Sequence, residues 1–385
     1  MPQDPHAMSL RRTTFLLAAG GGISVANIYY CQPLLGDMGH SLGVGEAPMG
    51  TAAAMTQAGT ALGMLVFVPL GDVFERRRLA SWMCVASACA VALTSVAPTF
   101  AWLVAASFLV GVANNIPHLL LPFAAQIAPD DQRGKVVGTV VGGLLIGILV
   151  SRFFSGWLGA MLGWRWVYRI ATLVMASLAV AVARLLPASP PTLRMPLRAL
   201  YASVAALVRD EAQLRAAAAS GALLFGAFSA FWTTLVFFLG TPPYHYGARA
   251  AGLFGLVAAA SAGIAPIVGR AVDRRPPSAG VVFGALFTLA GWCVLVLAGK
   301  LLAGLVAGVV LLDVGVQAGH VANQARIYKA FPVARSRANT AYMVSYFVGG
   351  AIGSILGAHA WSAFGWTGVC LVGMAFSALA GLVGR

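Results

Sequence analysis

Two charged residues, Arg152 and Asp313, lie in the middle of long apolar stretches. An ionised side chain at the centre of a membrane-spanning helix costs at least ~2.5–3.5 kcal/mol, so each should face a partner or a water-filled cavity. Asp313 follows Lys300 by 13 residues and Arg152 precedes Trp164 by 12, which places both at nearly the same depth in a bilayer. We predict that they pair, directly or through water, in at least one conformation, and that protonation of Asp313 releases Arg152. The alternative is that neighbours within its own half of the chain satisfy each residue.

A polar stripe extends along the chain from Asp313. Gln317, His320 and Gln324 follow it at spacings of four, three and four residues, which places them on one helical face. Asn114, His118 and Pro122 form a similar stripe earlier in the chain. Two such histidines favour a polar cavity over a hydrogen-bonded core, and neither has a second metal ligand three or four residues away. His320 therefore joins Arg152 and Asp313 as a candidate proton-coupling residue.

Other apolar stretches carry isolated amide and aromatic side chains. A lining of this kind suits an amphipathic organic solute, although aromatic residues in apolar helices also pack as ordinary core. The candidate substrate-cavity residues are Asn27, Tyr30, Gln32, Gln57, Asn114, His118, Trp232, Gln317, Gln324, Tyr342 and Tyr346.

The elements that must position these residues are membrane-spanning helices. Of the 385 residues 59% are hydrophobic and 9% charged, with a mean hydropathy of +0.85, whereas soluble domains have about 25% charged residues. This composition excludes a soluble enzyme, a disordered chain and a nucleic-acid binder. Twelve apolar stretches are long enough to cross a bilayer and do not alternate as strands would. They are 13–35, 47–70, 79–97, 102–127, 135–162, 166–186, 216–240, 248–269, 278–298, 301–325, 339–358 and 363–384.

A proline- and arginine-rich segment, 187–215, separates six of these stretches from the other six. We predict an all-α integral membrane protein with an N-terminal six-helix bundle at 1–186, a cytoplasmic linker at 187–215 and a C-terminal six-helix bundle at 216–385. The linker should contain one surface helix around 197–210. The five cysteines all lie in apolar stretches, which favours packing over a disulfide framework.

The positive charge is distributed on one side of the predicted membrane. The chain has 25 basic and 11 acidic residues and a net charge of +14. Most of the basic residues fall in the connections that share a side with the N-terminus, and the positive-inside rule makes that side cytoplasmic. Both termini are therefore expected in the cytoplasm, and the basic composition requires no nucleic-acid partner.

The two halves of the chain are related by an internal repeat at an offset of 202 residues. The register places Leu103 on Leu305, His118 on His320, Arg133 on Arg335, Gly147 on Gly349 and Gly163-Trp164 on Gly365-Trp366. At an offset of 201, Asp72 falls on Asp273, and arginines follow both, Arg76 to Arg78 in the first copy and Arg274-Arg275 in the second. Such a repeat predicts two six-helix units of the same topology, related by an axis along the membrane normal.

The loop after the second stretch resembles the signature of the major facilitator superfamily. The signature has a Gly, an Asp four residues later, then a Gly and basic residues; here Val68 and Glu75 stand in place of the glycines, while Asp72 and Arg76-Arg77-Arg78 match. The second copy, Gly269 to Arg275, keeps both the Gly and the Asp. The segments Asn27–Leu35, Asn323-Gln324 and Arg335–Thr340 resemble a bacterial subgroup described as drug or sugar-efflux permeases.

The resemblance implies the major facilitator fold, with two pseudo-symmetric six-helix bundles and helices 1, 4, 7 and 10 around a central cavity. It also implies a cytoplasmic gate, formed in one conformation and broken in another. The candidate gate residues are Asp72, Arg76, Arg77, Arg78, Asp273, Arg274, Arg335 and Arg337. The alternative for the arginines is that they only set topology. In the fifth stretch the glycines of efflux-type members are present, but Ser151-Arg152 replaces their Gly-Pro pair.

We therefore expect a non-enzymatic secondary active transporter in the bacterial inner membrane. Its partners would be the lipid bilayer, a small-molecule substrate and a proton, with no nucleic acid and no cofactor, and it would act as a monomer. The expected process is proton-coupled efflux of a small organic solute by alternating access. The alternatives are a proton-coupled uptake symporter and a non-transporting membrane sensor.

Overall fold

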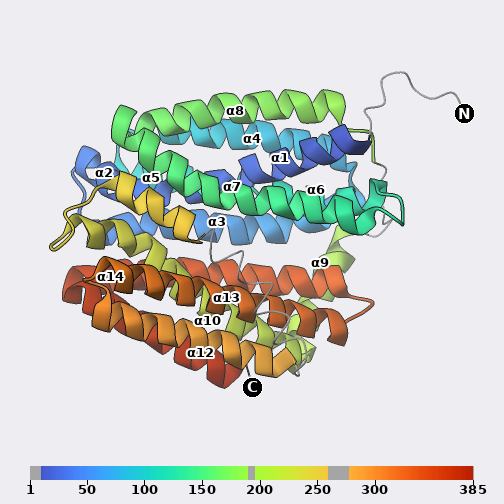
Figure 1. Ribbon diagram of the computed structural model, residues 1–385. Helices are drawn as coiled ribbons and strands as arrows, with labels where there is room; N and C mark the ends of the chain where they lie inside the picture. The colour runs from blue at the N-terminus through green and yellow to red at the C-terminus, as the bar shows by residue number, and fades with distance from the viewer. Residues whose placement is uncertain (1–9, 190–195, 259–276, 385) are drawn as a thin grey trace, which may run out of the picture.

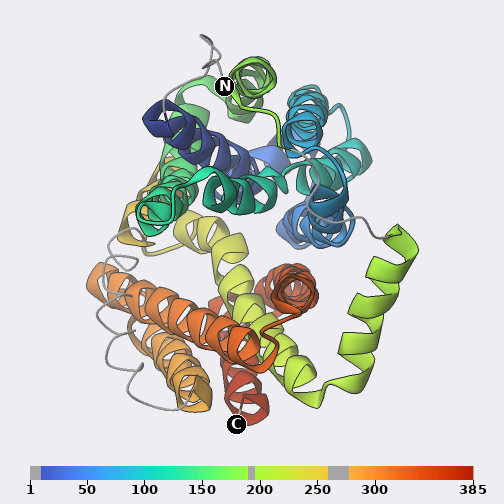
Figure 2. The same ribbon diagram turned by 90° about the vertical axis from the view of Figure 1, so that its right-hand side faces the viewer.

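The computed structural model describes residues 10–189, 196–258 and 277–384, except the side chains of Asp72 and Pro277. Within these ranges the chain is helical and contains no strand. Two groups of helices lie side by side, one from each half of the chain (Figure 1), and the view along the helices separates them clearly (Figure 2). The predicted all-α fold of two six-helix bundles is confirmed.

The N-terminal bundle contains eight helical segments that pack on one another. They are α1 (Leu10–Tyr29), α2 (Cys31–Leu42), α3 (Glu46–Val73), α4 (Arg76–Ser95), α5 (Phe100–Ala113), α6 (Ile116–Ile127), α7 (Arg133–Leu162) and α8 (Trp164–Leu185). The C-terminal bundle contains α10 (Ala212–Gly240), the apolar helix Ala248–Ala258, α12 (Pro277–Ala298), α13 (Leu302–Ala330) and α14 (Arg335–Val383). Between the bundles lies α9 (Leu197–Asp210), the surface helix predicted around 197–210.

Two of the predicted continuous helices are interrupted. The first breaks at Tyr30 between α1 and α2, and the fourth breaks at Asn114-Asn115 between α5 and α6. Proline explains both breaks, because Pro33 and Pro117 have no N–H to donate to the carbonyl four residues earlier and their rings crowd that turn. Each break exposes backbone polar groups at membrane depth, which a membrane protein tolerates only where protein or a polar cavity covers them.

In the part of the chain that the structure describes, ten helices have the length and composition to cross a membrane, counting α1 with α2 and α5 with α6 as one each. One of the ten, α14, reverses at Gly365, whose φ of 61° is favourable for glycine, and is therefore two helices, 335–364 and 366–383. Helix Ala248–Ala258 starts a further apolar segment whose continuation lies outside the described residues. Eleven of the twelve predicted spans are therefore seen in the described residues, and the one predicted at 248–269 lies largely outside them.

The repeat is visible in where the helices begin. Helices α1, α3, α5, α7 and α8 start at Leu10, Glu46, Phe100, Arg133 and Trp164, and 202 residues later helical segments start at Ala212, Ala248, Leu302, Arg335 and Trp366. The residues before the last pair, Gly163 and Gly365, both have positive φ. The predicted internal repeat is confirmed as a repeat of local structure.

We distinguish two ends of the molecule. The basic end is where α1, α7 and α14 begin and where α9 lies; the distal end is where α2, α7 and α10 finish. At the distal end the two bundles touch closely. A Cβ atom added to Gly156 of α7 would collide with Ala248 and Gly252, and one added to Gly50 of α3 would collide with Ala358 of α14.

These two contacts are related by the repeat, because Gly252 and Ala358 stand 202 residues after Gly50 and Gly156. We call the two contacts together the distal seam. The indole Nε1 of Trp361 also donates a hydrogen bond across this end to the Glu46 carboxylate. The distal seam therefore joins the bundles through backbone-to-backbone approach that only small residues permit.

Candidate functional site

Arg152 lies in α7 at the interface of the two bundles, with 1% of its surface exposed. Its Nε donates a 2.7 Å hydrogen bond to Oε1 of Gln32 in α2. The guanidinium carbon lies 4.6 Å from the ring centre of Tyr29 and 4.1 Å from that of Trp232, which belongs to the opposite bundle. Cation–π contacts of this kind strengthen when the cation is desolvated. Gln32 and Trp232, both predicted as substrate-cavity residues, therefore contact Arg152.

Asp313 approaches the same place from α13 and is 5% exposed. It interacts electrostatically with Arg152, and the side chain of Trp232 lies near its carboxylate without a hydrogen bond within 3.5 Å. No ion pair within 4.0 Å joins Asp313 to Arg152, so the predicted direct pair is not formed in this conformation. Trp232 stands between the two bundles as their shared neighbour. The pairing of Arg152 with Asp313 in another conformation stays a prediction.

Three polar atoms in this cluster have no hydrogen-bond partner. They are Nη2 of Arg152, Oδ1 of Asp313 and Nε1 of Trp232. Buried polar atoms without partners are rare, and at membrane depth each is costly. We call Gln32, Arg152, Trp232 and Asp313 the midplane cluster. Its free donors and acceptor make it the place in the described structure best prepared to take up a polar solute or water.

A second polar group lies in the C-terminal bundle. Nδ1 of His320 in α13 is 2.9 Å from the hydroxyl of Tyr342 in α14, and the His320 ring lies 4.7 Å from that of Tyr346. Tyr346 in turn stacks on Phe225 of α10 at 4.1 Å. His320, Tyr342 and Tyr346 were predicted separately as coupling or cavity residues, and the structure brings them together. Their roles stay predictions.

Asn114 hydrogen-bonds to helices of its own bundle. Its Oδ1 accepts hydrogen bonds from Ser24 and Asn27 of α1 and from Ser87 of α4, at 3.3, 3.0 and 2.8 Å. Its Nδ2 donates to the carbonyl of Val110 at 2.7 Å. These contacts occupy its Oδ1 and one N–H of its Nδ2, because the break before Pro117 turns the side chain toward α1 and α4. Asn114 thus ties three helices together, and its place in a substrate cavity stays a prediction.

Replacing Asn114 with Ala is expected to destabilise the N-terminal bundle by about 1–3 kcal/mol, because buried donors on α1 and α4 lose their acceptor. Thermal unfolding of the purified protein in detergent measures the effect. Asn115→Ala is the matched control, because Nδ2 of Asn115 donates only to carbonyls within its own segment, those of Gly111 and Val112. An equal fall in unfolding temperature for both variants would contradict the tie assigned to Asn114.

The remaining predicted cavity residues are less closely grouped. Tyr30 packs edge-on against Tyr168 of α8, within its own bundle. Gln57 is buried in α3 and its Oε1 has no partner. Nε2 of Gln324 donates to Asn339 of α14 at 3.4 Å. His118 and Gln317 are both half-buried, in α6 and α13.

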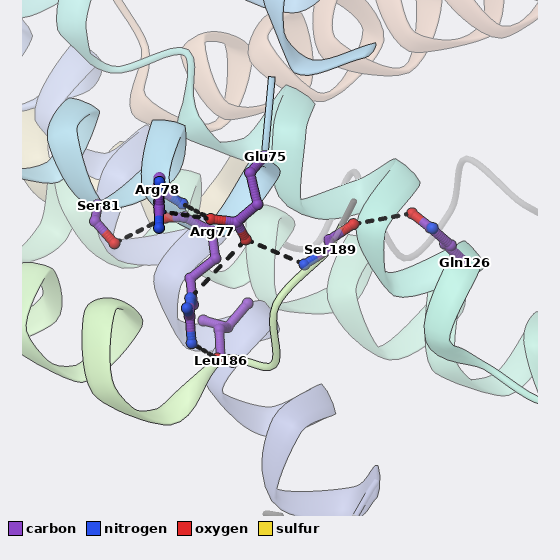
Figure 3. A network of polar contacts seen from close by, with 7 residues as sticks. All are labelled: Glu75, Arg77, Arg78, Ser81, Gln126, Leu186 and Ser189. Carbon is purple, nitrogen blue, oxygen red and sulfur yellow. Dashed lines mark hydrogen bonds and ion pairs between the residues drawn. The ribbon is translucent and has the colours of Figure 1, made fainter. Parts of the chain in front are cut away.

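The predicted gate at the basic end is tied to the N-terminal bundle and the linker (Figure 3). Nη1 of Arg76 donates to Gln126 of α6 at 2.7 Å, and Nη1 of Arg77 donates to the Leu186 carbonyl at 3.3 Å. Arg78 lies 3.6 Å from Glu75, its Nε to Oε2. These contacts lie within residues 75–189 and do not cross to the C-terminal bundle.

Glu75 organises this network although the family signature has a glycine in its place. Its carboxylate caps α4 by accepting from the backbone N–H of Arg78 at 3.1 Å, and it also accepts from the N–H of Ser189 in the linker at 3.1 Å. A carboxylate at a helix N-terminus is favourable for the helix dipole. The backbone of Asp72 lies in the last turn of α3, but its side chain is outside the described residues, as are Asp273 and Arg274. Arg335 and Arg337 lie in the first turn of α14 at the basic end.

Sequence reasoning missed several residues of the site. Tyr29 is one, although its spacing of three from Gln32 places both on one helical face and could have indicated it. Phe228, whose ring centre is 5.7 Å from the Arg152 guanidinium carbon, is another. The Glu46–Trp361 bond had no usable signal, because the two residues are 315 positions apart and neither lies in a motif.

The chain is similar to known membrane transporters. The family model described as Major Facilitator Superfamily matches residues 17–299. The uncharacterized transporter YgaY of Escherichia coli (strain K12) is 38% identical over 93% of this chain and 91% of its own length. The transporter SCO4007 of Streptomyces coelicolor is 36% identical over 98% of this chain and 88% of its own length.

Solved structures agree in fold. The nucleoside transporter NupG superposes with a TM-score of 0.80 at 14% identity, covering 97% of this chain and 98% of its own. A bacterial homologue of the human lysosomal transporter Spinster gives 0.74 at 13% identity, covering 100% and 97%. The family model matches most of the chain, the relatives are named as transporters, and solved transporter structures share the helical fold. This protein is therefore a non-enzymatic membrane transporter that belongs to the major facilitator superfamily.

Proposed function

We propose that this chain is a proton-coupled secondary active transporter of a small organic solute, working by alternating access about the midplane cluster. The observation that supports this most is the buried Arg152 and Asp313 at the junction of the two bundles, each with an unpartnered polar atom. Acidic residues inside membrane helices mark ion and proton pathways. A solute that enters between the bundles would contact residues of both, so its binding would be sensitive to their rocking.

The direction of transport depends on how solute and proton affect each other. Efflux in exchange for protons, the direction expected from the sequence, requires that proton and solute exclude one another from the site. Uptake together with a proton requires that they bind together. The free Nη2 of Arg152 favours the second candidate, because protonation of Asp313 leaves that cation without a counter-charge and ready for a solute. Efflux is retained as the alternative.

Several associated properties are proposed with the function. The arginine-rich basic end faces the cytoplasm of a bacterium and the protein lies in the inner membrane, following the positive-inside rule. The protein acts as a monomer, since one chain supplies both bundles. The arginines at the basic end contribute to a gate by holding the start of α4 to α6 and to Leu186 at the end of α8.

The test is solute accumulation by the purified chain in proteoliposomes under an imposed pH gradient of either polarity. We expect that one or more members of a panel of small organic acids, amines and neutral compounds accumulate against their concentration gradient. Accumulation should disappear when a protonophore collapses the pH gradient. Accumulation that persists with the protonophore, or its absence for every panel member in protein that binds solute, would contradict proton coupling.

A further inference from the structure

We infer that the solute is an organic anion, and that its carboxylate binds the free Nη2 of Arg152 while its apolar body lies against Trp232 and Phe228. The inference rests on the proposed function, since it assigns the chemical class of solute to the same midplane cluster. The sequence motifs do not specify the chemical class of the solute. We infer it from which polar atoms of the midplane cluster have hydrogen-bond partners and which have none.

The guanidinium group is held in one orientation. Gln32 occupies Nε at 2.7 Å, and the rings of Tyr29 and Trp232 cover the guanidinium within 4.6 Å of its carbon. Neither contact neutralises the charge, because an amide and an aromatic ring are both uncharged. Nη2 remains without a partner although Arg152 is 1% exposed. A fixed, desolvated guanidinium with a free N–H group is a site for a carboxylate or a similar anion.

The charges around the site favour an anion over a cation. The titratable groups that interact with Arg152 are Tyr29 of α1, Cys31 of α2 and Asp313 of α13. Of these, only Asp313 is a carboxylic acid, and Arg152 is the charged group that acts on it in turn. When Asp313 is protonated the cluster has a net charge of +1, which repels an amine and attracts a carboxylate. When Asp313 is ionised its own carboxylate competes with the solute for the same cation.

This competition couples the two ligands. The anion binds best to the protein that has already taken up the proton, and by thermodynamic reciprocity the proton binds best when the anion is present. One proton and one monovalent anion then cross together, so the loaded protein and the empty protein have the same net charge at the site. Proton and anion move in the same direction, which is cotransport.

The aromatic residues limit the shape of the solute. Phe228 and Trp232 are neighbours on α10 with ring centres 5.9 Å apart, and Phe228 continues to Phe225 and Tyr346 by stacking. Such a surface suits a flat apolar body attached to the carboxylate. We therefore expect aromatic carboxylates to bind better than short hydrophilic ones.

Binding of three matched probes to the purified full-length chain tests the inference. Benzoate, benzamide and benzamidine share one ring and differ in charge, being an anion, a neutral amide and a cation. Together with phenylacetate and acetate they are titrated against the thermal unfolding of the detergent-solubilised protein at pH 6 and pH 8. We expect the aromatic anions to stabilise the protein, more strongly at pH 6, and benzamidine and benzamide not to.

Substitutions at Arg152 locate the effect. Arg152→Gln should weaken benzoate binding at least about tenfold, because charge-assisted hydrogen bonds are stronger than neutral ones. Arg152→Lys should keep part of the benzoate binding, because Lys retains the positive charge. Partial binding by this variant shows that a substitution at position 152 does not simply prevent folding. Arg165→Gln is the matched control, since Arg165 also lies over a tryptophan ring, Trp164 at 4.2 Å, but lies at the distal end of the molecule. In Asp313→Asn, benzoate should bind equally at both pH values.

The outcomes separate this inference from the proposed function. If benzamidine or benzamide stabilises the protein and neither aromatic anion does, or if Arg152→Gln binds benzoate as well as the wild type, the inference is wrong. If pH-driven accumulation is found only for amines or neutral compounds, the inference is also wrong while the proposed function stands. If aromatic anions bind through Arg152 but no solute accumulates under a pH gradient, the inference stands and proton-coupled transport is wrong.

Discussion

Replacement of Asp313 with Asn is expected to abolish solute accumulation driven by a pH gradient while preserving solute movement down its own gradient. Asn cannot release or take up the proton, yet it keeps the size of the side chain on α13. A gradient of about two pH units supplies about 2.7 kcal/mol per proton, enough for about a hundredfold accumulation at one proton per solute. The variant should reach an accumulation ratio of about one, a loss of the whole effect.

The control for this variant is Asp37→Asn, which changes an exposed acidic residue of α2 near the distal end. It should accumulate solute as the wild type does. Exchange of labelled for unlabelled solute at equal pH on both sides should continue in Asp313→Asn, because that process needs the site but not the proton. Full pH-driven accumulation by Asp313→Asn would show that protons are coupled elsewhere or not at all.

The second large effect is expected at the distal seam, where Gly156→Ala should reduce transport at least about tenfold. The added Cβ would collide with the backbone of Ala248 and Gly252, so α7 and the helix Ala248–Ala258 could no longer approach. Backbone atoms do not move aside as a flexible side chain does. A shift of about 1.4 kcal/mol in the closing equilibrium corresponds to about a tenfold change in the population of the closed state.

Initial rates of solute uptake into proteoliposomes, with binding measured in parallel, show whether the defect lies in closure. Gly142→Ala is the matched control, because Gly142 lies on the same helix and an added Cβ there meets nothing within 4 Å. Binding should survive in Gly156→Ala, since the seam is not part of the midplane cluster. If transport by the two variants is equal, the distal seam is not required to close during the cycle. Gly50→Ala, which affects the repeat-related contact with Ala358, should behave like Gly156→Ala.

Much of the fold was predictable because a membrane constrains sequence strongly. Each membrane-spanning helix must form all its backbone hydrogen bonds within itself, so the length of the apolar stretches located the spans. The repeat at 202 residues predicted where helices begin in the second half of the chain. Surface helix α9 followed from its position in a polar linker. The breaks at Tyr30 and Asn114-Asn115 were missed because Pro33 and Pro117 stand within apolar runs, where hydropathy does not register a missing N–H donor.

The site was predictable in its charged residues and less so in its contacts. Arg152 and Asp313 stood out because a buried charge is costly, but the sequence indicated no partner beyond their equal depth. Gln32 was expected as a solute ligand and instead holds Arg152, a difference that depends on how α2 is rotated after its break. Asn114 was assigned to a cavity by its spacing from His118, yet the local turn directs it to α1 and α4.

Glu75 illustrates a different limit. In the sequence, Glu75 stands where the family signature has a glycine, and it indicated only a weaker match to that signature. In the structure its carboxylate caps α4 and accepts a hydrogen bond from Ser189 in the linker. Its role depends on a segment more than a hundred residues later returning to the same end of the bundle, which no local pattern specifies. Contacts of this kind require the tertiary arrangement and cannot be inferred from spacing.

The central claim is that solute and proton cross together through Arg152 and Asp313. Its most direct test is the pH inside proteoliposomes, read from an entrapped dye, after an inward gradient of an accumulated aromatic carboxylate is imposed with no initial pH gradient and with the membrane potential clamped. The lumen should acidify with the wild type at a rate above that of protein-free liposomes, and Asp313→Asn should remove that excess. Alkalinisation with the wild type, or transport of the labelled solute without any protein-dependent change in pH, would contradict the claim.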